Sequence, residues 1–111
     1  MTIQTDARGD TLRVAIQGDI DHHSAEPIRA AVDQAYLRDH CRNIRFDFSQ
    51  VQFMDSSGIG MLIGRYKLAE HGGGHVSICG LGENMAHLFH ISGLQKLIQI
   101  EQPKGGASRA E

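Results

Sequence analysis

The sequence predicts one α/β domain built on a mostly parallel β-sheet, and three observations lead to this fold class. The chain has 111 residues, which is the size of a single domain. Several short segments alternate apolar and polar residues, as half-buried strands do. Segments with helical spacing of apolar residues lie between them, in the order ββαβαβαβ. Helices between successive strands imply crossover connections, and so a mixed sheet of four or five strands with helices packed on it.

Each expected strand is a short stretch bounded by turn residues. In the second of them Leu12, Val14 and Ile16 lie on one side, and polar residues lie between them. The turn 6–10, which contains Gly9, allows a first strand to pair with it as a hairpin. The strands are expected at residues 3–5, 11–17, 43–48, 75–79 and 97–100.

The first expected helix covers residues 24–38. Ser24 is a favourable N-cap residue, and Pro27 then falls in the first turn, where a missing N–H has little cost. Its buried stripe is expected to comprise Ile28, Ala31, Val32 and Ala35. Arg29, Asp33 and Arg38 are expected on the outer, solvated face.

The second expected helix covers residues 57–70, with Ser56 as its capping residue. Arg65 and Lys67 are expected in solvent, with a docking face beside Ser57 as their functional alternative. Three glycines at 72–74 end this helix, and a third helix is expected over 83–91. The buried stripe of the second helix is expected to comprise Ile59, Leu62, Ile63, Tyr66 and Ala69.

Composition excludes several functional classes. The net charge of −2 and the pI of about 6.4 give no positive field for nucleic acid or anionic lipid. No apolar run approaches the ~20 residues that span a membrane, and the first residues lack the pattern of a signal peptide. Cys41 and Cys79 are expected to be reduced, buried thiols. We therefore expect a soluble, cytoplasmic protein that binds neither nucleic acid nor membranes.

Two loops at the carboxyl ends of strands carry the most informative residues, because functional loops gather at that edge of a parallel sheet. One is 18–24, with Asp19 and Asp21, and the other is 54–58. Ser57 is expected in the first turn of a helix, where free N–H groups and the helix dipole tolerate a phosphoryl group. Such a group would add about −1.5 to −2 charges beside Asp55. The structural alternative is a capping serine followed by glycines.

Enzymatic and metal-binding interpretations fit the sequence less well. Ser57 lacks the flanking glycines of a nucleophile elbow. A catalytic triad could be drawn from Ser57, Asp21 and either His22 or His23, but nothing in the spacing of these residues requires one. His87 and His90 stand three residues apart on a helix, without an evident third ligand. We therefore expect no cofactor, no metal and no enzymatic activity.

Four segments together resemble the STAS-domain anti-sigma factor antagonists, of which the sporulation type is the nearest. They are Gly18-Asp-Ile-Asp-His-His-Ser-Ala-Glu26, Phe53-Met-Asp-Ser-Ser-Gly-Ile-Gly60, Gly64-Arg-Tyr-Lys67 and Ser92-Gly-Leu94. The resemblance runs from about Ile3 to Glu101, and its main departure is Asp19 where the family usually has glutamate. It implies a STAS domain over residues 1–101 and a flexible tail over 102–111.

The resemblance also implies a partner-switching function. The unphosphorylated protein would bind an anti-sigma factor that is a serine kinase, and so release a sigma factor. That kinase would phosphorylate Ser57, and a PP2C-type phosphatase would reset the switch. The implied partner-binding residues are Asp21, His22, His23, Asp55, Ser56, Gly58 and Ile59, with Asp21 near the phosphorylated serine and Ser56 supporting the loop. A scaffold or nucleotide-binding role in another stress-response complex is the alternative.

Overall fold

The computed structural model describes residues 1–101 and contains one five-stranded sheet. Its strands follow one another in chain order, with β1 and β2 antiparallel and the other pairs parallel. The strands are β1 (Thr2–Arg8), β2 (Thr11–Gln17), β3 (Asn43–Gln50), β4 (Val76–Cys79) and β5 (Gln99–Ile100). The mixed, mostly parallel sheet expected from the ββαβαβαβ order is confirmed. The expected tail, 102–111, lies outside the described residues.

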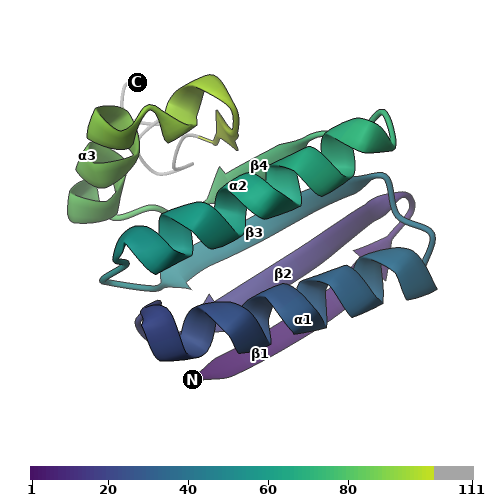
Figure 1. The fold of residues 1–111 in the computed structure, drawn as a ribbon, viewed down its shortest axis with the longest axis horizontal. Coiled ribbons are helices and arrows are strands. Elements are labelled where there is room, and N and C mark those ends of the chain that lie inside the picture. The colour runs from purple at the N-terminus through teal and green to yellow at the C-terminus, as the bar shows by residue number, and fades with distance from the viewer. Residues whose placement is uncertain (102–111) are drawn as a thin grey trace, which may run out of the picture.

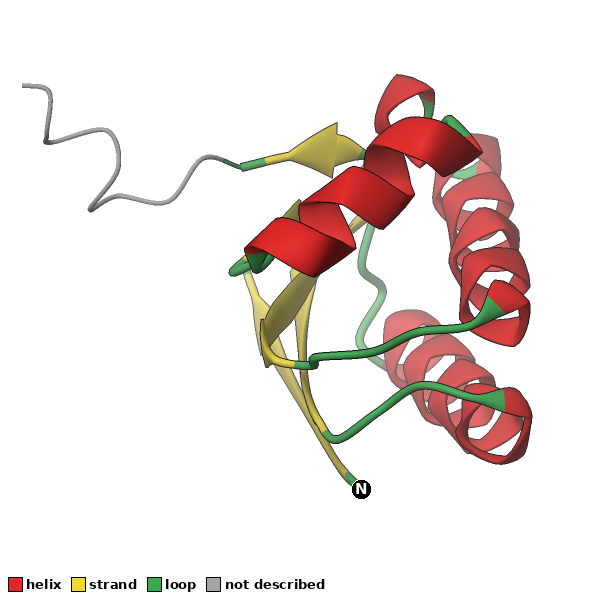
Figure 2. Ribbon diagram, turned by 90° about the vertical axis from the view of Figure 1, so that its left-hand side faces the viewer, coloured by secondary structure: helices red, strands yellow, loops and turns green. Residues whose placement is uncertain are grey.

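Three α-helices complete the fold of the described residues: α1 (His22–Arg38), α2 (Ser56–His71) and α3 (Glu83–Ser92). Figure 1 shows α1 and α2 running side by side in the same direction over the sheet. In Figure 2 α1 and α2 lie on one side of the sheet, and they leave its other face uncovered. A short 3₁₀ helix (Leu94–Lys96) precedes β5, which starts two residues later than expected. Because α1 and α2 both start at the carboxyl edge of the sheet, the loops that precede them lie together.

The core lies between the sheet and the helices. Side chains alternate between the two faces of each strand, and this alternation determines which of them enter the core. In β2, Leu12, Val14 and Ile16 face the helices and are at most 2% exposed. Phe48 of β3 contacts Phe89 of α3 edge to face, with ring centroids 6.4 Å apart. This contact holds α3 against the carboxyl end of β3. Arg13 and Arg45 alternate with the core residues and lie on the open face of the sheet.

The start of α1 differs from the expectation because an aspartate caps it. The helix begins at His22, and the Asp21 carboxylate accepts the backbone N–H groups of His23 (2.9 Å) and Ser24 (3.0 Å). Ser24 is the third helical residue, and its hydroxyl accepts the Asp21 N–H at 2.9 Å, which closes a capping box. The prediction that Ser24 is the N-cap of this helix was therefore wrong. Pro27 lies inside the helix as its sixth residue, not in the first turn.

In α2 the cap and the placement of one arginine also differ from the expectation. The helix begins at Ser56, and its N-cap is Asp55, not Ser56. Lys67 is exposed as expected, but Arg65 is buried, with 8% of its surface accessible. Arg65 faces α1, where its Nε lies 2.8 Å from Asp33. Asp33 therefore faces the neighbouring helix, and its placement on an outer, solvated face was wrong.

The two cysteines are free thiols, as expected. Cys41 is buried, whereas Cys79 at the end of β4 is only half-buried. Burial raises the pKa of both thiols, so both stay protonated at neutral pH.

Candidate functional site

The loops that precede α1 and α2 are joined by backbone hydrogen bonds. The Ile20 N–H donates to the Phe53 carbonyl at 2.9 Å, and the Asp55 N–H donates to the Ile20 carbonyl at 3.1 Å. Ile20 and Met54 thereby form a parallel bridge, and both side chains are buried. This bridge extends the β2–β3 pairing beyond the strands. It sets the N-termini of α1 and α2 next to each other in a fixed geometry.

Ser57 lies at this junction as the second residue of α2. Its backbone N–H donates to the Asp55 carboxylate at 2.8 Å, so Asp55 stands directly beside it. The Ser57 side chain is half-buried, and its hydroxyl makes no hydrogen bond within the described part of the chain. A hydroxyl that is neither buried in the core nor used for capping is available to a reactant from outside.

Ser57 lines a groove between the two parallel helices, with a volume of about 390 Å³. The α2 wall continues through Gly60, Met61, Gly64 and Arg65, and the α1 wall comprises His22, Ala25, Glu26 and Arg29. A Cβ atom added at Gly60 or Gly64 would meet open space. Ser57 and His22 occupy the end of the groove nearest the sheet edge, where both helices begin.

The other expected site residues divide into surface and packing positions. Surrounding the junction, His22, His23 and Ser56 are exposed, and Asp21 and Asp55 are half-buried. Two backbone N–H groups of the first turn of α1 hold the pKa of the Asp21 carboxyl below its usual range, chiefly that of Ser24 and then that of His23. Asp21 therefore presents a negative charge at neutral pH.

Gly58 and Ile59 have a structural role in the same turn. Gly58 is buried, and a Cβ atom there would lie 2.2 Å from Met54 Cγ and 2.9 Å from Ile20 Cγ2. Glycine is thus required at this position for the bridged loops to approach the helix. Ile59 is half-buried against the core.

An ion-pair network between α1 and α2, which the sequence did not indicate, forms the far end of the groove. Asp33 contacts Arg65 of α2 at 2.8 Å and Arg29 of its own helix at 3.2 Å. Glu26 accepts two hydrogen bonds from the same Arg29 guanidinium, one of them at 2.9 Å. These carboxylates raise the pKa of Arg29, while burial lowers that of Arg65. In the sequence, only the i, i+3 and i, i+4 spacing of Glu26, Arg29 and Asp33 could have indicated the part of the network that lies on α1.

The geometry does not assemble a catalytic triad at Ser57. The Asp21 carboxylate is used by backbone N–H groups of α1 and does not orient a histidine ring. Within residues 1–101, the Ser57 hydroxyl has no hydrogen bond to either histidine, which a nucleophile and its base would need. Over the same range, no group of three or more His, Cys, Asp or Glu residues is placed to hold a metal ion.

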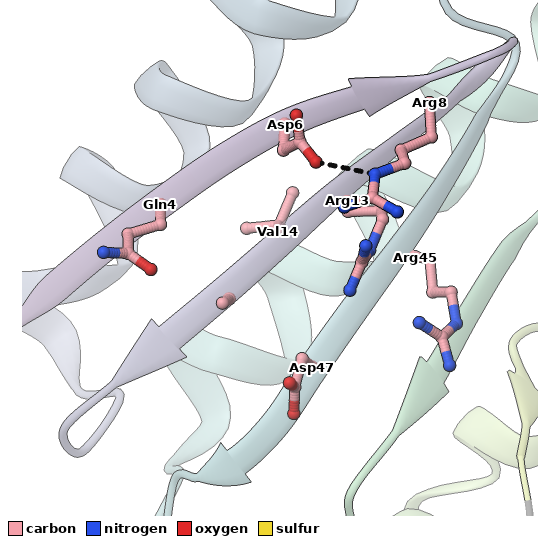
Figure 3. Close-up of a pocket in the computed structure, with 8 residues that line it drawn as sticks. Gln4, Asp6, Arg8, Arg13, Val14, Arg45 and Asp47 are labelled. Atoms are coloured by element: carbon pink, nitrogen blue, oxygen red, sulfur yellow. Dashed lines mark hydrogen bonds and ion pairs between the residues drawn. The ribbon is translucent and has the colours of Figure 1, made fainter.

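A second hollow, of about 220 Å³, lies on the open face of the sheet and contains none of the expected site residues. Figure 3 shows Arg13 beside Arg8, whose Nε donates to Asp6 at 3.1 Å. Arg45, the register partner of Arg13 on β3, donates two hydrogen bonds to Glu101 at 2.8 and 2.9 Å. This surface is on the opposite side of the sheet from the helices and from Ser57.

Comparison with known proteins agrees with this fold. The STAS domain family model matches residues 2–107. The anti-sigma F factor antagonist of Paenibacillus polymyxa is 35% identical over 100 residues, which cover 90% of this chain and 86% of that protein. The anti-sigma-B factor antagonist of Bacillus subtilis strain 168 is 31% identical over 108 residues, covering 96% and 97%.

The fold also matches a solved structure of the Bacillus cell fate determinant SpoIIAA in its phosphorylated form. The TM-score is 0.71 at 27% identity, and the match covers 99% of this chain and 100% of that one. The chain belongs to the STAS domain family. The Paenibacillus polymyxa and Bacillus subtilis relatives that it matches within that family are anti-sigma factor antagonists, which are regulatory proteins and not enzymes. Across the described residues, none of the helices has the length and apolar character that a bilayer crossing requires.

Proposed function

We propose that this protein is a partner-switching antagonist of the sporulation type, and that Ser57 is its switch. The unphosphorylated form binds an anti-sigma factor that is also a serine kinase, and the sigma factor held by that kinase is released. Phosphorylation of Ser57 ends the interaction, and a PP2C-type phosphatase restores it. The single observation that carries this proposal is the unused Ser57 hydroxyl, half-buried at the bridged junction of two helix N-termini.

The position of Ser57 suits a reversible modification better than the neighbouring Ser56. Both hydroxyls are free of hydrogen bonds among residues 1–101, but only Ser57 lines the groove between α1 and α2. In the proposed step the Ser57 Oγ attacks the γ-phosphorus of ATP bound to the kinase. The bond from that phosphorus to the bridging oxygen breaks, the hydroxyl proton passes to a base of the kinase, and ADP leaves. The α2 N-terminus favours the resulting dianion, so the fold is retained.

The surface around Ser57 supplies the contacts for the kinase. Asp21 provides a fixed negative charge, and His22, His23 and Ser56 are exposed around the same junction. Phe53, in the loop before α2, is 54% exposed although it is a large apolar side chain. An exposed aromatic beside charged groups is typical of the centre of a protein–protein interface.

The site assignment is tested by phosphorylation of single-serine variants. With the cognate kinase and ATP, we expect the parent protein to gain one phosphate and Ser57→Ala to gain none. Ser56→Ala is the matched control, and it should still be phosphorylated because its neighbour is intact. Intact-mass spectrometry reads all three. A phosphate on Ser57→Ala would assign the switch to another residue. The same conclusion would follow if Ser56→Ala gained no phosphate while Ser57→Ala still gained one.

A further inference from the structure

We propose that His22 is the intramolecular ligand of the phosphoryl group on Ser57, so that the phosphorylated form is held by a contact across the two helix N-termini. This inference rests on the proposed modification of Ser57 and adds a positioning residue for it. His22 is the first residue of α1 and Ser57 the second of α2, and both line the same end of the groove. The bridge between Ile20 and Met54 fixes the two helix starts relative to each other.

The charges in the groove leave His22 as the available donor. Arg29 is engaged by Glu26 and Asp33, and Arg65 by Asp33. Within residues 1–101 the His22 side chain forms no hydrogen bond or ion pair, and its ring contacts only the edge of His23 at a centroid distance of 5.7 Å. An imidazole without a partner can donate to a phosphoryl oxygen through either ring nitrogen, and as a cation it adds an opposite charge.

The negative charges around Ser57 explain why a phosphoryl group there would need a positively charged partner. A phosphoryl group on Ser57 would stand beside Asp55, whose carboxylate already receives the Ser57 N–H, and near Asp21. Neighbouring negative charges disfavour the second ionisation of a phosphate, whereas a neighbouring positive charge favours it. Glu26 and Arg29 from α1 and Arg65 from α2 face the same groove but neutralise one another or are neutralised by Asp33. His23 and Asp19 are nearby on the chain but do not line the groove.

The test uses phosphoserine placed at position 57 during translation, so that its outcome does not depend on the kinase. Phosphorus-31 NMR follows the second ionisation of the phosphoserine between pH 4 and 8. In the His22→Gln variant we expect its midpoint to rise by about half a unit to one unit relative to the parent, because the positive partner is lost. His23→Gln is the matched control, with the same loss of a histidine outside the groove, and its midpoint should match that of the parent.

Two results would overturn the inference. One is an unchanged midpoint in His22→Gln, and the other is an equal rise in both variants, which would show a general effect of positive charge and no specific contact. Circular dichroism of each variant verifies that the fold is retained. Either result leaves the proposed switch standing, since that proposal is tested separately, by phosphorylation of Ser57 and by its effect on binding to the kinase.

Discussion

A phosphoryl group on Ser57 is expected to weaken binding to the anti-sigma kinase about a thousandfold, which corresponds to about 4 kcal/mol. The group would introduce a dianion into a contact surface that already contains the Asp21 and Asp55 carboxylates. A dianion that the partner cannot pair must lose its hydration on binding, and this loss supplies the required free energy. Isothermal titration calorimetry of the kinase with the parent and the phosphoserine-57 protein measures the ratio.

Single substitutions separate charge from other effects of the modification. Ser57→Asp should weaken binding in the same direction but less, because aspartate carries one charge and is shorter than phosphoserine. Ser56→Asp places the same charge on the exposed neighbour outside the groove, and its loss of affinity should be the smaller of the two. Equal affinity of the parent and the phosphorylated protein would contradict an electrostatic switch at this serine.

The second large effect is expected on stability, from Asp33→Ala. Removing this carboxylate leaves the Arg65 guanidinium buried between two helices without its partner, since the Arg65 side chain is only 9% exposed. Loss of one member of a fully buried pair costs about 3–5 kcal/mol, and because the Asp33 side chain is 25% exposed we expect about 2–3 kcal/mol. Urea unfolding monitored by circular dichroism gives the free energy of unfolding.

Asp6→Ala is the matched control for this measurement. Its ion pair with Arg8 has similar chemistry but lies on the open sheet face, with side-chain exposures of 61% and 69%. Such a pair contributes about 0–1 kcal/mol, so Asp6→Ala should leave the midpoint nearly unchanged. If Asp33→Ala were no more destabilising than Asp6→Ala, Arg65 would not depend on the ion pair between the helices.

The elements of this fold could be predicted from the sequence because each carries its own local pattern. Alternation of Leu12, Val14 and Ile16 between polar residues identifies β2 without reference to the rest of the chain. The helix caps were less predictable, because Asp21 and Ser24 are both good capping residues and the competition was decided by the bridge at Ile20. The bridge fixes where the loop ends and so selects Asp21.

Contacts between elements could not be predicted in the same way. The sequence shows an arginine on α2 and an aspartate on α1, but nothing local indicates that Arg65 and Asp33 meet across the helix interface. The same holds for the groove that brings His22 of its α1 wall to the same end as Ser57 of its α2 wall. Ser57 itself was predictable as a candidate, because its position before Gly58 at a helix start is a local feature.

Competition for the kinase is the most direct test of the switch. A complex of the cognate sigma factor with its anti-sigma kinase is titrated with the parent protein, and free sigma factor is measured by size-exclusion chromatography. We expect the unphosphorylated protein to release the sigma factor and the phosphoserine-57 protein to leave the complex intact at the same concentration. Equal release by the two forms would contradict a switch at Ser57.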